Sequence, residues 1–579
     1  MTASGGHGDV QFVSRTGQLR FSAPGQILEA REKSDVMGLL RHAAAQVALG
    51  KYAAGFLAYE AAPAFDPALR THPPGDHPLA WFGIYDAPET LPPLNELADG
   101  ADPAPWRPLI DETAYREGVA RIRNLIAAGD TYQLNYTFPM QAAFEGDAWA
   151  WFTRLCAAQR GDHGAYVHAG RYRILSASPE LFFSLDGDRI VTRPMKGTHA
   201  RGLWPEQDRR FARTLENSVK DRAENLMIVD LLRNDLGRIA QTGTVEAERL
   251  FDIERFETLL QMTSTVSART DADVPEILAA LFPSGSVTGA PKVRTMAIIR
   301  DIEPHPRGVY CGIIGWWGPG RRAEFNVAIR TVTVDTVARN ATYNVGGGIT
   351  WDSTPEAEFE ECRLKAAVLT RRLPDFELLE SLRWDGAYSL LDEHLQRLKD
   401  SADYFGFPYD EQAIRSALDA AAIGANTPRP AKVRLRLARS GAVACTATPV
   451  STTGRWRVGI AHHPIDSSSV LLYHKTTHRA LYDAALAQCP GCDDAILWNG
   501  RGEVTETTIA NIVIERAGRL ITPPLECGLL PGVFRAMLIA SGQLEEDIVR
   551  LDELRVAPRI HLINSVRGWI DARVAGIWT

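Results

Sequence analysis

Lys196, in the stretch RPMKGT, has neighbours that would suit its amine to act as a nucleophile. The β-branched residues before it predict a strand, and Pro194 and Gly197 predict that the lysine lies where this strand runs into a turn. Arg193 and Arg201 would disfavour a further cation nearby, which lowers the pKa of the lysine and frees its amine to attack an electrophile. The alternative is a solvated surface lysine between two arginines.

Two predicted helices carry carboxylates that could bind a metal ion. In the helix expected from Lys220 to Leu236, Glu224 shares a face with apolar residues, where a carboxylate is unfavourable unless it is paired with a cation. Its partner would be a metal ion or a nearby arginine. In the helix expected over 355–370, Glu361 and Lys365 lie four residues apart on one face, and the alternative there is an exposed ion pair.

Two segments rich in small residues could approach a ligand closely. The loop over 283–292 leads into a helix, and its backbone N–H groups could hold an anion, although the Gly-Lys-Ser/Thr order of a Walker loop is absent. The strand expected from Tyr343 ends in three glycines, Gly346 to Gly348, which permit close approach of the backbone to a ligand.

The elements that must position these residues alternate between strands and helices. A helix is expected from Asp111 to Gly129, followed by strands around 131–138, 165–168, 172–176, 181–185, 189–192, 311–317 and 325–334. A proline-rich stretch over 87–108 and a change of character at Phe376 indicate boundaries. We therefore expect a mixed α/β, multidomain chain with domains at 1–108, 109–371 and 376–579.

Composition excludes several classes of protein. The 579 residues carry a net charge of −8, which gives no basic footprint for nucleic acid, and no apolar run is long enough to cross a membrane. The N-terminus lacks the features of a secretory signal. Seven scattered cysteines fit reduced thiols in the cytoplasm, and the single C-x-x-C at 489–492 has no second ligand pair.

Several motifs occur in one order that resembles a known group of enzymes. They are Ser178-Pro179-Glu180, 193–198, 224–236, 284–292, 328–331, 346–348 and 361–365. Residues 10–371 thus resemble the chorismate-utilising enzymes, which include anthranilate synthase and isochorismate synthase. This resemblance implies a two-layer β-sheet core with flanking helices. The lysine in RPMKGT is similar to that of the aminodeoxychorismate synthase component I family, whereas anthranilate synthases usually carry a small residue there.

This resemblance implies roles for the residues already singled out. Lys196 would attack C2 of chorismate and expel the C4 hydroxyl, ammonia would then add at C4 and expel the lysine, and Glu180 would shuttle protons. Mg²⁺ would be held by Glu224 and Glu361 and would neutralise one substrate carboxylate, while Arg330 would bind the other. The residues implied to close the pocket are Thr288, Gly347, Gly348 and Lys365.

Residues 376–579 resemble the fold-type IV pyridoxal-phosphate enzymes, which include 4-amino-4-deoxychorismate lyase and the branched-chain aminotransferases. The resemblance implies that Lys475 holds pyridoxal 5'-phosphate as a Schiff base and that Glu506 faces the pyridine nitrogen, so that the ring acts as an electron sink. Once freed, Lys475 would take a ring proton as pyruvate leaves. The residues implied to bind the phosphate are Arg397, Val533, Phe534 and Ser565.

Three departures from the family patterns stand out. Gln261 occupies a position where many relatives have histidine, and a glutamine can only hydrogen-bond there. Trp316 stands where a tyrosine often occurs, and it cannot accept a hydrogen bond. The second half begins late, without the N-terminal strands usual in the stand-alone enzyme, so we expect its small subdomain to lean on the first domain.

Together the resemblances imply a fused enzyme that makes 4-aminobenzoate from chorismate and ammonia for folate synthesis. No Gly-x-Cys-x-Gly turn of a glutamine amidotransferase is present, so a separate amidotransferase partner is implied, and a homodimer through the pyridoxal-phosphate half is a further implied assembly. Three alternatives stay open. The first half could act as an anthranilate synthase. The second half could be a class IV aminotransferase of the branched-chain or D-amino-acid type, or only a scaffold.

Overall fold

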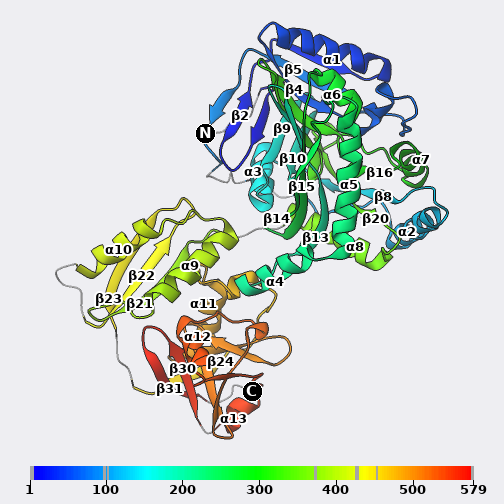
Figure 1. Cartoon of the computed structure of the whole chain (residues 1–579). Coiled ribbons are helices and arrows are strands. Elements are labelled where there is room, and N and C mark those ends of the chain that lie inside the picture. Colours follow the sequence, from blue (N-terminus) through cyan, green and yellow to red (C-terminus); the bar gives the residue numbers. More distant parts are fainter. Residues whose placement is uncertain are drawn as a thin grey trace. The chain divides into compact units, whose positions relative to one another are not determined.

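The chain folds into two compact units, described here from a computed structural model that covers residues 6–94, 100, 103–370, 374–423, 429–450, 454–557 and 559–575 (Figure 1). The first unit falls within residues 1–201 and 211–372. The second falls within 373–579 and also includes Gly202–Arg210, which the sequence analysis placed in the first half. The two halves of the sequence are therefore not two simple consecutive units.

The first unit is built on two ten-stranded sheets, in which neighbouring described strands run antiparallel. One sheet contains β1 (Val10–Val13), β2 (Gln18–Phe21), β6 (Glu89–Leu91), β7 (Arg107–Pro108), β8 (Gln133–Ala143), β9 (His163–Ala169), β10 (Tyr172–Ser178), β16 (Gly289–Ala290), β19 (Thr331–Asp335) and β20 (Asn340–Ile349). The other contains β3 (Gln26–Ala30), β4 (Tyr52–Leu57), β5 (Ala80–Tyr85), β11 (Leu181–Asp186), β12 (Arg189–Arg193), β13 (Met195–Ala200), β14 (Glu246–Arg255), β15 (Leu259–Arg269), β17 (Ile313–Gly318) and β18 (Arg322–Val327). The expected two-layer sheet core is thus present, and strands from residues 1–108 complete both sheets.

Two of the places where the chain crosses between the two sheets are adjacent. One crossing joins β10 to β11 at 178–180, and the other joins β18 to β19 at 328–330. Because β10 pairs with β19 and β11 with β18, the crossings lie side by side, and the Val327 N–H donates to the Glu180 carbonyl at 3.1 Å. We expected one strand over 325–334. It is broken because Arg330 adopts a left-handed backbone with φ of 51°, which cannot continue a strand.

The helices of the first unit begin and end largely where sequence signals predict. They are α1 (Lys33–Ala48), α2 (Glu112–Ala127), α3 (Ala148–Gln159), α5 (Val219–Gly237), α6 (Val274–Leu281), α7 (Lys292–Ile302) and α8 (Pro355–Ala366). Asp111 caps α2 by accepting a hydrogen bond from the Ala114 N–H, and Ser218 caps α5 through the Asp221 N–H. Helix α5 packs on β13 and β15, which brings Glu224 close to the strand that carries Lys196.

The second unit has two sheets of its own. The three-stranded sheet consists of β21 (Leu378–Trp384), β22 (Ala431–Leu437) and β23 (Val443–Pro449), with α9 (Leu391–Phe405) and α10 (Glu411–Ile423). The eight-stranded sheet consists of β24 (Trp456–Ile460), β25 (Asp494–Trp498), β26 (Val504–Thr507), β27 (Asn511–Arg516), β28 (Arg519–Thr522), β29 (Glu545–Glu546), β30 (Ile560–Asn564) and β31 (Gly568–Val574), and its region includes α11 (Ala480–Ala487), α12 (Val533–Ala540) and α13 (Glu553–Val556). No helix in the described ranges is both long and apolar enough to span a bilayer.

Candidate active sites

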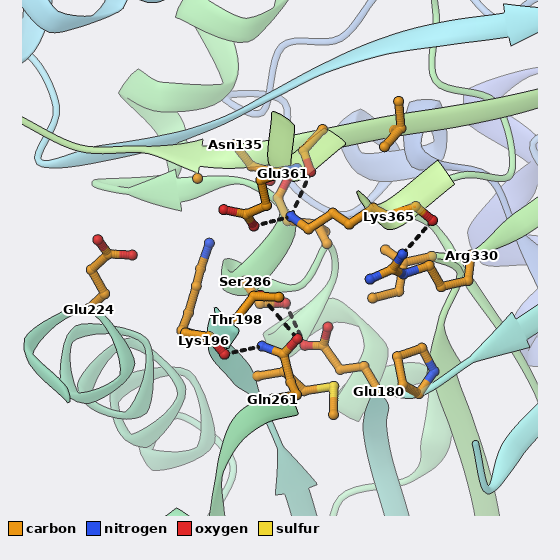
Figure 2. Close-up of a pocket in the computed structure, with 18 of the residues that line it drawn as sticks. Asn135, Glu180, Lys196, Thr198, Glu224, Gln261, Ser286, Arg330, Glu361 and Lys365 are labelled. Carbon is orange, nitrogen blue, oxygen red and sulfur yellow. Dashed lines mark hydrogen bonds and ion pairs between the residues drawn. The ribbon is translucent and has the colours of Figure 1, made fainter. Parts of the chain in front are cut away.

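A cavity of about 300 Å³ in the first unit is lined by residues from the two adjacent crossings and from β13, α5, β20 and α8 (Figure 2). The sequence-predicted residues that it brings together are Glu180, Lys196, Glu224, Arg330, Gly348, Glu361 and Lys365. These residues span almost 190 positions of the chain. The two sheets and their crossings are what unite them.

Lys196 lies in a short strand rather than in the turn that the sequence predicted. Pro194 has no N–H and ends β12, but the chain then resumes pairing with β15 as β13. The register shifts between Met195 and Thr198, and Gly197 takes a left-handed φ of 93° at this bulge. Gln261 on β15 holds the bulge, because its Nε2 donates to the Gly197 carbonyl at 2.8 Å. This hydrogen bond gives a structural role to the glutamine that replaces histidine.

The pKa of Lys196 is lowered, as expected, but the cause is different from the one predicted. Burial is the main cause, since an ammonium is poorly solvated in the cavity wall, and the nearby Lys365 adds to the effect. Glu224 partly opposes it. The two flanking arginines are engaged elsewhere: Arg193 pairs with Glu254 at 2.6 Å, and Arg201 donates to the Phe256 carbonyl at 2.6 Å. The alternative of a solvated surface lysine is excluded.

Gly348 on β20 faces the amine of Lys196. A Cβ atom at this position would lie 2.5 Å from Lys196 Nζ, so a larger residue would displace the amine from where it lies. The same Cβ would lie 2.8 Å from Nε2 of Gln133, a fully buried residue whose amide has no hydrogen-bond partner among the described residues. Sequence reasoning missed Gln133, because a single polar residue in a predicted strand gave no sign that it would lie beside Gly348.

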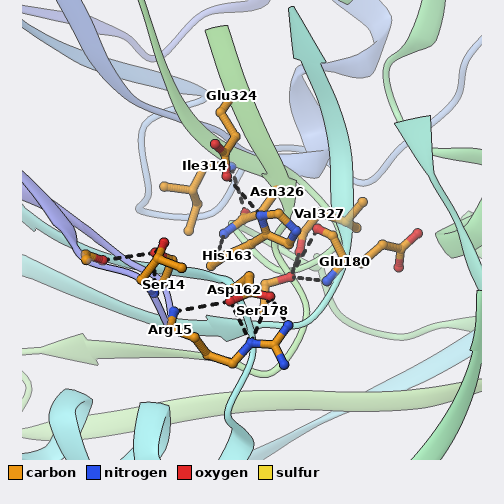
Figure 3. Close-up of polar contacts among 12 residues, drawn as sticks. Ser14, Arg15, Asp162, His163, Ser178, Glu180, Ile314, Glu324, Asn326 and Val327 are labelled. Carbon is orange, nitrogen blue, oxygen red and sulfur yellow. Dashed lines mark hydrogen bonds and ion pairs between the residues drawn. The ribbon is translucent and has the colours of Figure 1, made fainter. Parts of the chain in front are cut away.

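Glu180 is held at the first crossing by Ser178 and by the neighbouring crossing (Figure 3). The Ser178 hydroxyl donates to the Val327 carbonyl at 2.6 Å and accepts from the Glu180 N–H at 3.2 Å. The Glu180 carboxylate accepts a hydrogen bond from the Ser286 hydroxyl at 2.6 Å. Burial raises the pKa of Glu180 to about 7, which suits a group that both gives and takes protons near neutrality.

The carboxylates of Glu224 and Glu361 both line the cavity. Burial raises the pKa of Glu224. Burial also opposes ionisation of Glu361, but Lys365, whose Nζ lies 2.6 Å from its carboxylate, outweighs burial and keeps the pKa of Glu361 below its usual value. Lys365 also donates to the Gly346 carbonyl at 2.9 Å, so this is a cavity pair and not the exposed pair considered from sequence.

This donor set suits magnesium. Within the described residues no group of three His, Cys, Asp or Glu side chains forms a ready metal cluster. Mg²⁺ is usually bound by one or two carboxylates together with water and substrate oxygens, so Glu224 and Glu361 fit it. Glu358, to which the sequence analysis gave no role, adds a third carboxylate to the cavity wall, is itself buried, and accepts from the Ser353 hydroxyl at 2.6 Å.

The remaining predicted pocket residues lie in different environments. Arg330 lines the cavity, and its Nη1 donates to the Lys365 carbonyl at 2.6 Å. Its strained φ angle is the kind of backbone feature that collects at functional sites. Gly347 faces Glu358, whose Oε2 would lie 2.9 Å from an added Cβ. The Thr288 hydroxyl is outside the lining and donates to the Ser284 carbonyl at 3.0 Å, so it shapes the loop.

A second cavity, of about 170 Å³, lies in the second unit. All six residues predicted to serve the cofactor line it: Arg397, Lys475, Glu506, Val533, Phe534 and Ser565. Burial, reinforced by the positive charge of Arg397, lowers the pKa of Lys475 to about 8. The backbone there is fixed by the Leu379 N–H, which donates to the Lys475 carbonyl at 2.9 Å.

Glu506 also lines this second cavity. Burial raises the pKa of its carboxyl to about 8. The Tyr482 hydroxyl donates to Oε1 at 3.0 Å, and Asn511 Nδ2 approaches Oε2 at 3.4 Å. A carboxyl group whose ionisation burial disfavours is stabilised as a carboxylate by a neighbouring cation, so Glu506 is suited to face the protonated ring nitrogen of pyridoxal phosphate. Tyr482 was not identified from sequence, since nothing marks a single tyrosine in a helix.

The phosphate-binding side of the cavity combines Arg397 with a helix N-terminus. Arg397 forms a bidentate pair with buried Glu380 at 2.8 and 2.7 Å and donates to the Pro531 carbonyl at 3.0 Å. A guanidinium has five N–H groups, so two remain for a phosphate. Gly532 begins α12, and a Cβ there would lie 2.0 Å from Asn511 Oδ1. The donors present therefore fit a phosphate group.

Comparisons with known proteins relate each of the two cavity-bearing halves of the chain to a family. Residues 5–371 match the chorismate binding enzyme family, and residues 377–574 match the amino-transferase class IV family. The chain is 42% identical to aminodeoxychorismate synthase component 1 of Salmonella typhimurium over 259 residues, which is 44% of this chain and 56% of that protein. It is 38% identical to anthranilate synthase component 1 of Streptomyces coelicolor over 269 residues, 46% of this chain and 52% of that protein. The chain thus spans just over half the length of these relatives.

Solved structures show the same fold for the first unit. Anthranilate synthase component I from Streptococcus pneumoniae superposes with a TM-score of 0.52 at 25% identity, covering 63% of this chain and 90% of that one. The menaquinone-specific isochorismate synthase MenF from Escherichia coli superposes with a TM-score of 0.51 at 18% identity, covering 63% and 89%. The second similarity concerns the fold alone.

Proposed function

The chain belongs to the chorismate binding enzymes, and on this basis we propose that its first unit aminates chorismate to 4-amino-4-deoxychorismate, which its second unit converts to 4-aminobenzoate and pyruvate for folate synthesis. The observation that carries the proposal is the half-buried Lys196, whose lowered pKa and position in the cavity suit it to be a nucleophile. We favour this reaction over that of an anthranilate synthase, because an anthranilate synthase needs no amine nucleophile at the position of Lys196.

In the first unit, each group of the substrate has a suitable partner. Arg330 would bind one carboxylate of chorismate as a bidentate fork. Glu224 and Glu361 would hold Mg²⁺, which would neutralise the other carboxylate. The Lys196 amine would form a bond to C2 as the C4 hydroxyl leaves with a proton from Glu180, and ammonia would then bond to C4 as the lysine leaves.

In the second unit, the chain's own residues bind and move protons. Pyridoxal phosphate would supply an electron sink when bound. Arg397, Ser565 and the N-terminus of α12 would bind its phosphate, and Glu506 would keep its ring nitrogen protonated. Lys475, with its pKa near 8, would take the ring proton of the substrate whose loss makes the product aromatic.

The proposal is tested by incubating the purified chain with chorismate, Mg²⁺ and ammonium, with and without pyridoxal phosphate, and identifying the products by mass spectrometry. We expect 4-aminobenzoate and pyruvate with the cofactor, and 4-amino-4-deoxychorismate without it. Anthranilate as the product would overturn the assignment of the first unit. In cells we propose that a separate glutamine amidotransferase supplies the ammonia, so glutamine should replace ammonium only when that partner is added.

A second candidate function for the second unit is amino transfer, because its family model is that of class IV aminotransferases. Amino transfer to a keto acid by the purified chain, in the absence of chorismate, would favour this candidate. Conversion of 4-amino-4-deoxychorismate to 4-aminobenzoate without any keto acid would exclude it as the main activity.

Glu361→Gln should weaken the response of the first activity to magnesium. The change removes one negative charge from the proposed metal site, and losing a direct ligand should cost at least the roughly tenfold in metal affinity that loss of an outer partner costs. The measurement is the Mg²⁺ concentration that gives half-maximal amination. Glu360→Gln, on an exposed residue of α8 that pairs with Arg363, is the control. An unchanged magnesium requirement in Glu361→Gln would contradict the assignment.

Glu180→Gln should slow amination by about a hundredfold or more, since general acid–base catalysis is typically worth that much. The carboxyl of Glu180 is protonated below its pKa of about 7, so the wild-type rate should lose its acid-dependent part as the pH rises through 7. The pH–rate profile of kcat checks this, with Glu117→Gln on the exposed face of α2 as the control. A variant that keeps the wild-type profile would remove Glu180 from the mechanism.

A further inference from the structure

Residues Gly202, Leu203 and Trp204, here called the 202–204 segment, follow directly after the strand that carries Lys196, yet they pack within the second unit. The Tyr404 hydroxyl on α9 donates to the Gly202 carbonyl at 2.8 Å. Leu203 contacts two apolar clusters of the second unit, and Trp204 is 6% exposed. The segment is therefore an integral part of this unit.

The shape of the 202–204 segment is fixed locally. The Gly202 N–H donates to Asp208 Oδ1 at 3.0 Å, and the Leu203 N–H donates to Gln207 Oε1 at 2.6 Å. A Cβ atom on Gly202 would lie 2.1 Å from the Asp208 backbone nitrogen, so the tight turn into α4 (Pro205–Glu216) requires glycine. Arg209 on α4 adds an ion pair with Asp400 at 3.2 Å.

The indole of Trp204 stacks on Tyr473, with ring centroids 5.2 Å apart and planes at 28°. Tyr473 precedes Lys475 by two residues, is 1% exposed, and donates its hydroxyl to the Ser467 carbonyl at 2.8 Å. Large stacked rings of this kind contribute about 0.5–1.5 kcal/mol beyond the area they bury. Trp204 therefore covers one face of the residue that leads into the candidate catalytic lysine.

His474, which directly precedes Lys475, is linked to the 202–204 segment through Tyr404. His474 shares a hydrogen bond of 2.9 Å with the Ser401 hydroxyl, and its ring lies 4.5 Å from that of Tyr404. Tyr404 in turn holds Gly202. Tyr473 therefore contacts the 202–204 segment directly, and His474 is linked to it through Tyr404. This segment lies about 270 positions earlier in the sequence.

We propose that Trp204 is a positioning residue of the second active site, acting through Tyr473 to hold Lys475 in the cavity that it shares with Glu506. The inference rests on the proposed pyridoxal-phosphate function of the second unit. It means that a segment from the first half of the chain completes the second catalytic unit.

The test uses the full-length chain with Trp204→Ala, Trp204→Phe and Tyr404→Phe. In Trp204→Ala, looser packing lets water reach Lys475, so the midpoint of the pH-dependent absorbance of the bound cofactor should move upward from that of the wild type. Equilibrium binding of pyridoxal phosphate should weaken, and 4-aminobenzoate formation should fall about tenfold or more, since small misplacements of reacting groups are costly. Amination of chorismate by the first unit should stay within about twofold of the wild-type rate, because Trp204 lies outside that cavity.

Rescue and controls separate positioning from general stability. Trp204→Phe keeps a stacking ring and should restore most of the midpoint, whereas Tyr404→Phe keeps the ring but removes the hydrogen bond to Gly202 and should shift the midpoint in the same direction by less. Trp569→Ala, at a tryptophan of the same unit that is 39% exposed and outside the cavity, should change nothing.

Two results would overturn the inference. The first is a Trp204→Ala chain with unchanged midpoint and cofactor affinity. The second is a loss of both activities that Trp204→Phe does not restore. If the wild-type chain itself binds no pyridoxal phosphate, the proposed function of the second unit fails instead, so the two failures are distinguishable.

Discussion

Lys196→Ala should reduce formation of 4-amino-4-deoxychorismate by about a thousandfold or more, because loss of a nucleophile removes the bond-forming step itself. Conversion of supplied 4-amino-4-deoxychorismate to 4-aminobenzoate should be unaffected, since Lys196 lines only the first cavity. The measurement is the rate of each half-reaction with its own substrate. Lys399→Ala, on an exposed face of α9, is the matched control.

The pH dependence of the amination rate is a second test of the role of Lys196. Burial lowers the pKa of Lys196, so the fraction of free amine rises with pH at a lower pH than for a lysine in water, and the rate of the amine-dependent step should rise with it. A wild-type rate that increases only near the ordinary lysine pKa would contradict a buried nucleophile. So would a Lys196→Ala chain that aminates chorismate at the wild-type rate.

Lys475→Ala should abolish release of pyruvate and 4-aminobenzoate, again by about a thousandfold or more, while 4-amino-4-deoxychorismate accumulates from chorismate. The reason is that the variant loses both the attachment point for the cofactor and the group that takes the ring proton. Pyruvate release and the absorbance of the cofactor-loaded chain check the two losses separately. A variant that still releases pyruvate would leave the second unit as a scaffold or place its chemistry elsewhere.

The pKa of Lys475 sets the expected pH profile of this second reaction. The amine is protonated below about pH 8 and free above it, so the proton-accepting step should accelerate as the pH rises towards 8 and then level off. Lys432→Ala is an informative comparison, because this lysine lines the same cavity from β22 but is not among the charged groups that shift the pKa of Lys475 most. It should retain the wild-type pH midpoint to within a few tenths of a unit.

Residue type and spacing alone were enough to single out several residues that line the first cavity. Lys196, Glu224, Glu361 and Lys365 were chosen from helical spacing and from a strand–proline–glycine pattern, and the structure brings them into one cavity. The expected strands over 165–192 and the helix over 220–236 are present with small shifts of their ends. These features depend on local periodicity, which a single sequence displays directly.

Properties that arise from contacts between residues far apart in the sequence could not be predicted from it. The pKa of Lys196 was attributed to Arg193 and Arg201, because neighbours in sequence are visible and burial is not. The break at Arg330 arises from a change of sheet, which local β propensity over 325–334 conceals. Gly348 lies beside Gln133 because β20 pairs with β8.

The shared segment has a consequence for how the chain is made. Tyr473 leaves the ribosome about 270 residues after Trp204, a delay of roughly 10–50 seconds at ordinary rates of synthesis. During that time the first unit can fold around Lys196, but the indole that ends up buried has nothing to stack on. A nascent or prematurely terminated chain therefore displays an apolar ring a few residues after Lys196, a natural target for chaperones and for quality-control proteases.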